Sequence, residues 1–169
     1  MTLQEAKDRF IQTWGALGSN WGINKTMAQV HALLLVSNEL LSTEDVMEKL
    51  QISRGNANIN IRALIDWGLI ERTNVKGDRK EYFIAEKDIW KIATMIVNER
   101  RKREVEPILK ALKQVKDIEP KSADKTEIRQ FTDFIESLEN FTGTIDGVFE
   151  KFCRADQSWF TSTILKFFR

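Results

Sequence analysis

Along most of the chain apolar residues recur at three- and four-residue spacing, which is typical of helices, and one short segment has the pattern of a β-hairpin instead. Between residues 41 and 85 the order is a short helix, a three-residue turn, a second helix and two strand-like segments. The second helix has small or apolar residues three and four positions apart, which share one face of an α-helix: Ala57, Ile61, Leu64, Ile65 and Gly68. The strand-like segments are residues 70–74 and 80–84, and Gly77-Asp78 between them suits a tight hairpin. This order predicts a winged helix-turn-helix.

Capping residues mark where both helices of this segment begin. Ser42 or Thr43 can cap the first helix, and Glu44 and Asp45 follow in its first turn, where the helix dipole favours negative charge. Ser53 can cap the second helix in the same way. The turn between the two helices is therefore expected to be short.

Helical periodicity also covers the N-terminal part of the chain. Residues 3–17 form one amphipathic helix, whose apolar side holds Ala6, Phe10, Ile11, Trp14 and Leu17. Gly15, Gly18 and Gly22 are expected to loosen the link to a second helix over residues 25–37.

The C-terminal part reads as helix as well. Residues 87–117 are helical, and Pro107 predicts a kink or a break because proline removes a backbone donor and clashes with the preceding turn. Residues 120–122 are the clearest linker. Residues 124–152 form another amphipathic helix, and residues 156–169 are a strongly aromatic tail.

Long apolar-striped helices on both sides of a winged helix favour dimerisation, because a domain of about 60 residues cannot cover them. The alternative is that the aromatic tail folds back on its own chain. We predict a mainly α fold with a small β-hairpin wing. Its parts are an N-terminal dimerisation helix (1–20), a winged helix-turn-helix DNA-binding domain (21–86) and a C-terminal helical dimerisation region (87–169).

The face of the second helix opposite its apolar stripe is polar and not acidic. It holds Gly55, Asn56, Ile59, Arg62 and Ala63, with Asn58 and Asn60 on its flanks. Asn can pair with adenine and Arg with guanine, while an apolar group can meet the thymine methyl. An aliphatic residue such as Ile59 has little reason to lie on a solvated face unless a partner covers it.

The hairpin tip carries basic residues that suit phosphate contacts, which position a protein on DNA without reading its sequence. The candidate DNA-binding residues are Ser53, Arg54, Gly55, Asn56, Asn58, Ile59, Arg62, Lys76, Arg79 and Lys80. The alternative is an ordinary solvated helix face beside a cationic loop, which the preceding capped helix, the turn and the hairpin make less favourable.

Three segments of the chain resemble one known family. They are SRGNANINIRALIDWGLIER, GDRKEYFIAEKDIWKIA and NERRKREVEPIL, and the match covers about residues 10–112. The segments resemble the betaine-synthesis-repressor (GbsR) branch of the multiple-antibiotic-resistance-repressor (MarR) superfamily. This resemblance implies a homodimeric winged-helix transcriptional regulator that binds palindromic operators in double-stranded DNA, acts as a repressor and can answer to a small ligand. The family often has Ser or Thr where this chain has Asn58.

Composition agrees with this interpretation. The 169 residues are 42% hydrophobic and 30% charged, with a net charge of +1, which is typical of a soluble globular protein and not of a generally adhesive nucleic-acid binder. One Cys and one His exclude a disulfide framework and make a transition-metal site implausible. There is no glycine-rich phosphate loop and no paired nucleophile, so we expect neither an enzyme nor a bound cofactor. With no apolar run long enough to cross a membrane and no signal peptide, the cytoplasm is the expected compartment.

Aromatic residues suggest an effector site. Quaternary ammonium ligands are held over aromatic faces, and the family resemblance implies choline-like effectors in some members. The candidate effector-binding residues are Trp14, Trp21, Trp67 and Trp90. The alternative is that these side chains are ordinary core. His31 is expected to be structural, and the run from Arg100 to Arg103 is expected to be a solvated helix face, with contact to the DNA backbone as its alternative.

Two functions of different class remain open on the sequence. One is a dimeric DNA-binding transcriptional regulator, and the other is a winged-helix protein–protein interaction module without DNA binding. A module that had lost DNA binding would tolerate carboxylates on its recognition face. The second helix has only Asp66, near its end, which favours the regulator.

Overall fold

A computed structural model describes residues 1–20, 22–118 and 124–155 of the chain. The chain divides into two compact units, Met1–Ile92 and Ala93–Arg169, called here the N-terminal and the C-terminal unit. Helices dominate the described residues of both units, and three short strands form a small antiparallel sheet in the N-terminal unit. The predicted fold class, mainly α with a small β wing, is confirmed.

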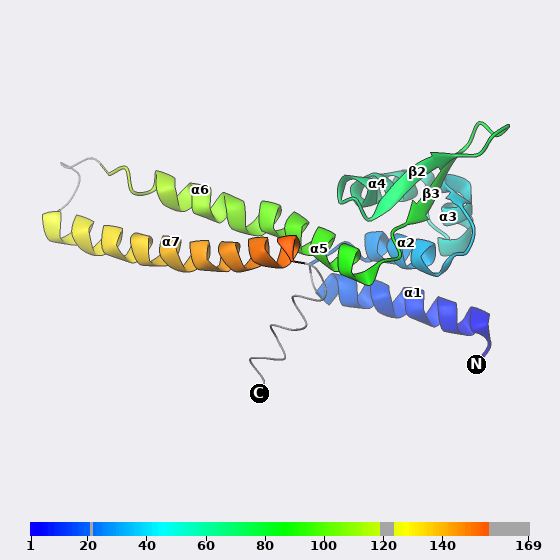
Figure 1. Cartoon of the computed structure of the whole chain (residues 1–169), viewed down its shortest axis with the longest axis horizontal. Helices are drawn as coiled ribbons and strands as arrows, with labels where there is room; N and C mark the ends of the chain where they lie inside the picture. The colour runs from blue at the N-terminus through cyan, green and yellow to red at the C-terminus, as the bar shows by residue number, and fades with distance from the viewer. Residues whose placement is uncertain (21, 119–123, 156–169) are drawn as a thin grey trace. The chain divides into compact units, whose positions relative to one another are not determined.

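The N-terminal unit has the predicted order of helix, turn, helix and hairpin (Figure 1). Its helices are α1 (Leu3–Asn20), α2 (Lys25–Val36), α3 (Thr43–Leu50) and α4 (Arg54–Asp66), and its strands are β1 (Leu41–Ser42), β2 (Ile70–Asn74) and β3 (Glu81–Ala85). The predicted second strand of the hairpin was placed one residue too early, at residues 80–84. Strand β2 has the predicted bounds.

Strand β1 is an element that the hydrophobic pattern did not predict. Its two residues pair with β3, Leu41 opposite Phe83 and Ser42 opposite Tyr82, and the sheet order is β1-β3-β2. Two residues are too few to show the alternation by which strands are recognised. The short strand joins the start of the helix-turn-helix to the base of the hairpin.

Helix α2 is the centre of the N-terminal unit. Its buried residues face all sides of the helix, and they are Met27, Ala28, Val30, His31, Ala32, Leu33 and Leu34. A helix that is apolar around most of its circumference belongs in a core. Lys87, which follows β3, caps the end of α2, because its ammonium donates hydrogen bonds to the carbonyl oxygens of Leu34 at 2.9 Å and Ser37 at 3.0 Å.

The two glycines of α1 allow close helix packing and do not loosen a link, so the prediction was wrong for Gly15 and Gly18, whereas Gly22 lies in the link between α1 and α2 with φ of 76°. Gly15 and Gly18 lie inside α1, which continues to Asn20, and both are buried. A Cβ at Gly15 would lie 2.5 Å from Cγ of Gln29, and one at Gly18 would lie 2.6 Å from Cβ of Ala28. Helix α2 therefore approaches α1 more closely than a larger residue at either glycine would permit.

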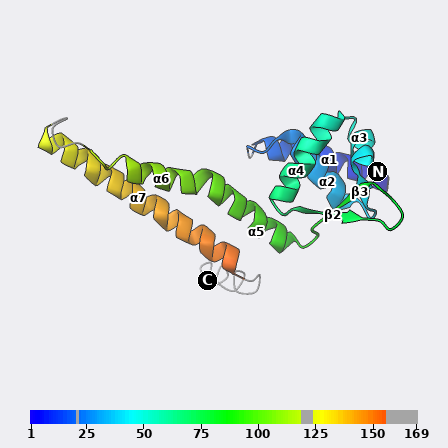
Figure 2. The same cartoon turned by 90° about the horizontal axis from the view of Figure 1, so that it is seen from above.

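The C-terminal unit holds helix α6 (Glu106–Gln114), helix α7 (Lys125–Arg154) and most of helix α5 (Ile89–Arg100). Figure 2 shows α7 running antiparallel beside α6. The predicted interruption at Pro107 takes the form of a π-helical turn at Arg101–Val105, where the backbone N–H of Glu106 donates to the carbonyl oxygen of Arg101. Because proline has no N–H to donate, a change of hydrogen-bond register just before it costs little. The predicted linker at residues 120–122 and the aromatic tail at 156–169 lie outside the described residues.

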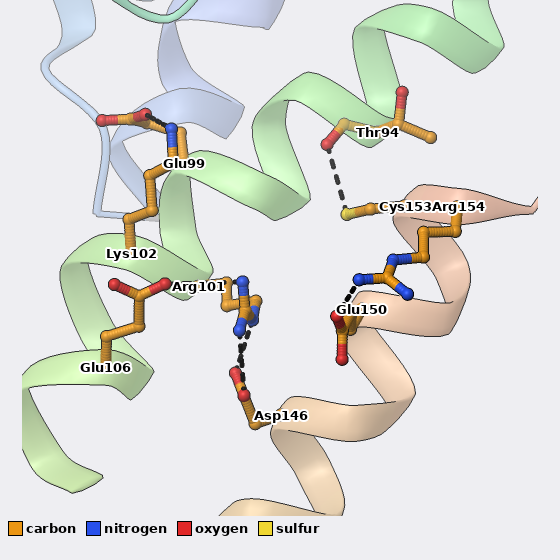
Figure 3. Close-up of polar contacts among 9 residues, drawn as sticks. All are labelled: Thr94, Glu99, Arg101, Lys102, Glu106, Asp146, Glu150, Cys153 and Arg154. Carbon is orange, nitrogen blue, oxygen red and sulfur yellow. Dashed lines mark hydrogen bonds and ion pairs between the residues drawn. The ribbon is translucent and has the colours of Figure 1, made fainter.

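Ion pairs join the π turn to α7 (Figure 3). Arg101 donates to the Asp146 carboxylate through Nε at 2.5 Å and Nη2 at 3.0 Å. Arg100, Lys102 and Arg103 pair with Glu104 or Glu99 on their own helical segment. The contacts of Arg100, Lys102 and Arg103 support the interpretation of the basic run as an internally paired helix face, whereas for Arg101, which lies against α7, that prediction was wrong. Nearby, the Cys153 thiol donates to the carbonyl oxygen of Thr94 at 3.6 Å, and burial raises its pKa.

Among the helices that the structure describes, none combines the length and the hydropathy needed to span a bilayer.

Candidate DNA interface

Two capped helices and a tight turn position the recognition helix α4. Ser42 and Asp45 form a reciprocal capping box at the start of α3, in which the Asp45 N–H donates to Ser42 Oγ at 3.3 Å. Ser53 caps α4 by accepting from the Asn56 N–H at 3.3 Å. Between them Gln51 takes a left-handed backbone conformation, with φ of 54°. The predicted caps and the three-residue turn are therefore confirmed.

Helix α4 separates a buried face from an exposed one. Ala57, Ile61 and Leu64 are buried, as predicted, whereas Ile65 is only half-buried. Gly68 lies beyond the helix with φ of 75°, where it ends α4 and takes no part in the core. The opposite side is open to solvent. Of the predicted recognition face, Ala63 is half-buried, and the exposed members are Gly55, Asn56, Ile59 and Arg62, with Arg54 exposed at the helix start. Ile59 has an exposed fraction of 70%.

Asn60 does not lie on a flank of the recognition face, as the helical wheel had suggested. It is buried, and its side-chain amide donates to the backbone oxygen of Asn56 at 2.8 Å and to Asn56 Oδ1 at 2.7 Å. Because Asn60 follows Ala57 by three positions and precedes Leu64 by four, the apolar spacing itself could have placed it in the core. Its hydrogen bond fixes the Asn56 amide with the Nδ2 donors directed away from Asn60.

A cationic cleft of about 550 Å³ lies between α4 and the wing. Its lining includes five cations, and these are Arg54, Arg62, Arg72, Arg79 and Lys80, together with the carboxylates of Glu44 and Glu81. Of the other predicted residues, Asn58 also lines the cleft, while Ser53, Gly55, Asn56, Ile59 and Lys76 are exposed outside it. The excess of positive charge suits a polyanion.

Arg72 is a cleft residue that the sequence reasoning missed. It pairs with Phe83 in the sheet and forms an ion pair with Glu81 at 2.8 Å. Residues two positions apart on a strand share a face, so Arg72 lies on the same face of β2 as buried Ile70. Alternation along β2 therefore contained the signal, whereas the predicted basic cluster covered only the hairpin tip.

Besides the pair of Arg72 and Glu81, a second ion pair in the cleft joins Arg54 to Glu44. Arg54 Nη2 lies 2.7 Å from Glu44 Oε1, which ties the first residue of α4 to the first turn of α3. The pKa of Glu44 is lowered, first by a hydrogen bond from its own backbone N–H and then by Arg54. Glu44 is therefore ionised at neutral pH and faces the same cleft as the cations.

The wing has a braced tip. Gly77 has φ of 90°, and the N–H of Asp78 donates to the carbonyl oxygen of Val75 at 3.0 Å. The Asp78 carboxylate accepts from Tyr82 Oη at 2.7 Å and from the Lys80 N–H at 3.0 Å, and these contacts lower its pKa in that order. Lys76, Arg79 and Lys80 are exposed around this brace.

The tryptophans named as effector candidates lie on different elements. Trp14 on α1 is half-buried, and its ring lies 5.4 Å from that of Phe10. Trp67 is the C-cap residue of α4 and Trp90 lies in the first turn of α5, and both are half-buried. Trp21 lies outside the described residues. An aromatic cage stays a prediction.

A capped helix-turn-helix with an exposed second helix, followed by a basic hairpin, defines the winged helix-turn-helix class of DNA-binding proteins. Residues 21–81 match the model of the MarR family. The chain is 25% identical over 138 residues to the HTH-type transcriptional repressor GbsR of Bacillus subtilis, across 82% of this chain and 73% of that protein. It is 33% identical over 75 residues to the HTH-type transcriptional regulator MmpR5 of Mycobacterium tuberculosis, across 44% of this chain and 46% of that protein.

A solved structure described as that of a transcriptional regulator has the same fold, with a TM-score of 0.57 and 22% identity over 86% of this chain and 99% of that one. The family-model match over residues 21–81 and the two relatives support a DNA-binding transcriptional regulator of the GbsR/MarR type. The resemblance inferred from the three sequence segments is confirmed.

Proposed function

We propose that the protein binds a palindromic operator as a homodimer and represses transcription. The observation that supports this most is the cationic cleft, because α4 and the wing contribute charges to one surface that can follow a DNA groove and its flanking backbone. The two-fold symmetry of a palindrome is met by a two-fold protein, and one winged helix alone buries too little DNA for tight specific binding. Repression is proposed because the relative that matches 82% of this chain, GbsR of Bacillus subtilis, is named as a repressor.

The residues of the interface divide into three roles in this proposal. Arg54, Asn56 and Ile59 read bases from the exposed face of α4, and Gly55 lets the backbone approach a phosphate closely. Ser53, Asn58 and Arg62 contact the edges of the groove. Lys76, Arg79 and Lys80 hold phosphates from the wing, and we add Arg72 to this group.

Titration of fluorescent DNA from the region upstream of the protein's own gene tests the proposal. The full chain should bind this duplex at least about 10³-fold more tightly than a shuffled duplex of equal composition, with two protomers on each duplex. The logarithm of the binding constant should fall linearly with the logarithm of the salt concentration. Equal affinity for both duplexes would contradict operator recognition, and the absence of binding at low salt would favour the protein–protein interaction module.

We further propose that a quaternary ammonium compound acts as effector. The support is the resemblance to the GbsR branch together with the half-buried Trp14, Trp67 and Trp90. Choline should change tryptophan fluorescence and weaken operator binding, whereas 3,3-dimethylbutanol, its neutral isostere, should do neither, since a ring face attracts the charge. An equal response to both compounds would contradict the aromatic site.

A further inference from the structure

Asn60 is a polar residue in the apolar face of helix α4. Its exposed fraction is 4%, and the buried residues that share this face are Ala57, Ile61 and Leu64. A polar group that is removed from water must keep its hydrogen bonds, because an unpaired one costs free energy. Asn60 meets this requirement through one neighbour, since its Nδ2 donates to the backbone oxygen of Asn56 at 2.8 Å and to Asn56 Oδ1 at 2.7 Å.

Helix stability does not explain an asparagine at this position. Leucine has nearly the same size, a higher helix propensity and an apolar side chain that would extend the buried face. The net contribution of one hydrogen bond to folding is small, and it mainly offsets the cost of burying the amide. The reason for an asparagine here therefore lies in its contact with Asn56, which is the exposed member of the pair.

The direction of the Asn56 amide follows from this contact. A backbone carbonyl can only accept, so the atom of Asn60 that lies against the Asn56 backbone oxygen must be the NH2 nitrogen. The same NH2 group also contacts the Asn56 side chain, and a donor at this place requires the oxygen Oδ1 and excludes a second NH2 group. Oδ1 is therefore turned inward to Asn60, and Nδ2 is turned outward.

Contacts within the chain hold the polar atoms of Asn56 other than Nδ2. The Asn56 backbone N–H donates to Ser53 Oγ at 3.3 Å, and both oxygens of Asn56 accept from Asn60. In the part of the chain that the structure describes, no group accepts a hydrogen bond from Asn56 Nδ2. Asn56 thus presents donors, without an acceptor, to a molecule that lies against the exposed face of α4.

We propose that Asn60 determines the base that Asn56 reads, and that this base is guanine. The inference rests on the proposed operator binding and names one base pair of each half-site. Adenine offers the acceptor N7 beside the donor N6, so a bidentate pair with adenine needs both amide atoms of Asn56 to face outward. Guanine offers two acceptors, N7 and O6, which suit an NH2 group presented end-on as they suit the ammonium of lysine. The residue type alone suggests adenine, and the contact with Asn60 favours guanine instead.

The two pyrimidines fit an outward NH2 group less well than guanine does. Cytosine presents its N4 amino group, which would meet the Asn56 NH2 group donor to donor. Thymine presents one acceptor, O4, beside a methyl group, so the NH2 group can make one hydrogen bond there and not two. Guanine should therefore be preferred over any other base by about 10- to 100-fold, which is the discrimination of one good bidentate contact.

Selection from randomised duplexes tests the inference with the full-length chain. The wild type should enrich a two-fold operator, and Asn56→Ala should lose the preference at one position of each half-site, where the wild type selects guanine. Replacing this guanine with 7-deazaguanine, which lacks the N7 acceptor, should weaken wild-type binding by about fivefold and leave Asn56→Ala unaffected. Inosine keeps N7 and O6 and should be bound like guanine. Another base at this position, or no position that responds to Asn56→Ala, would overturn the assignment.

Variants of Asn60 separate the orientation of the Asn56 amide from packing. Asn60→Leu removes the hydrogen bond and keeps the volume, so Asn56 can turn Oδ1 outward, and the ratio of guanine to adenine affinity at this position should fall at least about fivefold. Asn60→Asp offers Nδ2 an acceptor, which favours Oδ1 outward, so adenine should become the preferred base. Ile61→Val is the matched control, because Ile61 lies in the same buried face and has no polar atom to hold Asn56, and it should keep the wild-type ratio. An unchanged ratio in Asn60→Leu, with wild-type helix content by circular dichroism, would overturn the inference.

The hydrogen bond can also be measured without DNA and without a substitution. In the 15N-labelled wild-type chain, the side-chain NH2 protons of Asn60 should exchange with solvent at least about tenfold more slowly than those of Asn56, because the Asn60 amide is buried and bonded. Equal exchange at both side chains would show that Asn60 does not hold Asn56, even if both Asn60 variants fail to fold.

Failure of operator binding and failure of this inference give different results. If the wild type enriches no sequence, the proposed operator binding fails, and the inference fails with it. If the wild type enriches an operator whose guanine preference is the same in Asn60→Leu, operator binding stands and the role of Asn60 alone is lost.

Discussion

Arg54 Nη2 donates to Glu44 Oε1 across 2.7 Å, and this pair links the two helices of the helix-turn-helix at the edge of the proposed DNA cleft. Both side chains are well exposed, so the pair contributes little to folding. The pair instead fixes the orientation of the Arg54 guanidinium, because Glu44 holds it on one side of the start of α4.

Glu44→Gln should therefore change DNA recognition more than stability. Loss of the carboxylate removes repulsion of phosphate and frees Arg54, so affinity for shuffled DNA should rise while the preference for the operator narrows. Glu48→Gln, on the exposed face of α3, is the control and should leave the preference as it is. Binding to both duplexes at three salt concentrations measures the effect. If Glu44→Gln keeps the wild-type preference for the operator over shuffled DNA, the ion pair with Glu44 is not what orients Arg54 for recognition.

Base contacts and phosphate contacts should respond differently to substitution. Arg54→Ala or Asn56→Ala should cost about 1–3 kcal/mol of binding to the operator and little on shuffled DNA. Lys76→Ala or Arg79→Ala should weaken both duplexes alike and lower the salt slope by about one. Mobility-shift titrations on both duplexes measure this. Equal losses on both for Arg54→Ala and Asn56→Ala would remove these residues from base reading.

Ile59 should contribute to DNA binding and not to folding. With 70% of the side chain exposed, Ile59→Ala should change the free energy of unfolding by less than about 0.5 kcal/mol. Ile61→Ala, two residues on and buried, should cost about 2–5 kcal/mol. We expect Ile59 to meet a thymine methyl, so replacing operator thymines one at a time with uracil should reproduce the loss at one position. Full affinity on every uracil duplex would exclude that contact.

Stability should fall between about pH 6.5 and pH 4 because of one buried imidazole. Burial, with Lys87 as a second cause, lowers the pKa of His31 from 6.5 to about 4. The unfolded chain binds the proton first, so this stabilisation is full above pH 6.5 and is lost as the pH falls toward 4, by on the order of 3 kcal/mol. His31 is the only histidine in the sequence, and its Nε2 has no hydrogen-bond partner among the described residues. In urea titrations across this range, His31→Leu should reduce the dependence of the free energy of unfolding on pH. If that dependence is unchanged in His31→Leu, carboxylates and not His31 cause it.

Three glycine-to-alanine variants should distinguish the effect of close helix packing on stability from the effect of helix propensity. Gly18→Ala should destabilise the fold by about 1–3 kcal/mol, because its Cβ would lie 2.6 Å from Cβ of Ala28. Gly15→Ala should cost less, since the clash is with the flexible Gln29 side chain. Gly143→Ala on α7 meets no atom within 4 Å and should stabilise by about 0.5–1 kcal/mol. Thermal unfolding ranks the three variants, and a neutral Gly18→Ala would mean that α1 and α2 can move apart.

Local signals in the sequence were sufficient for the helix-turn-helix and its wing. Ser42 and Ser53 act within their own first turns, and Gly77 needs only its own backbone conformation, so each could be predicted without knowledge of the rest of the chain. Strand β1 could not, because its two residues become a strand only through pairing with β3.

The errors at Gly15, Gly18 and Arg72 share a physical origin, which is that the role of each residue depends on a partner distant in sequence. Gly15 and Gly18 look like flexible points until α2 is packed against them. Arg72 looks like an unremarkable strand residue until α4 is placed opposite its face. Asn60 is a different case, since its spacing from Ala57 and Leu64 indicated burial and its polarity argued against it.

The π turn at Arg101–Val105 has a consequence for how this chain aligns with its relatives. A π turn corresponds to one residue inserted into an α-helix, and its wider turn takes up the roughly 100° by which that residue would otherwise rotate everything that follows. Deleting one residue here should therefore convert the turn to regular α-helix and leave Leu112 buried. The π turn thus lets this segment carry one more residue without a change in the phase of α6. Relatives with a one-residue gap at this point should keep their apolar positions after the gap on the same face of the helix.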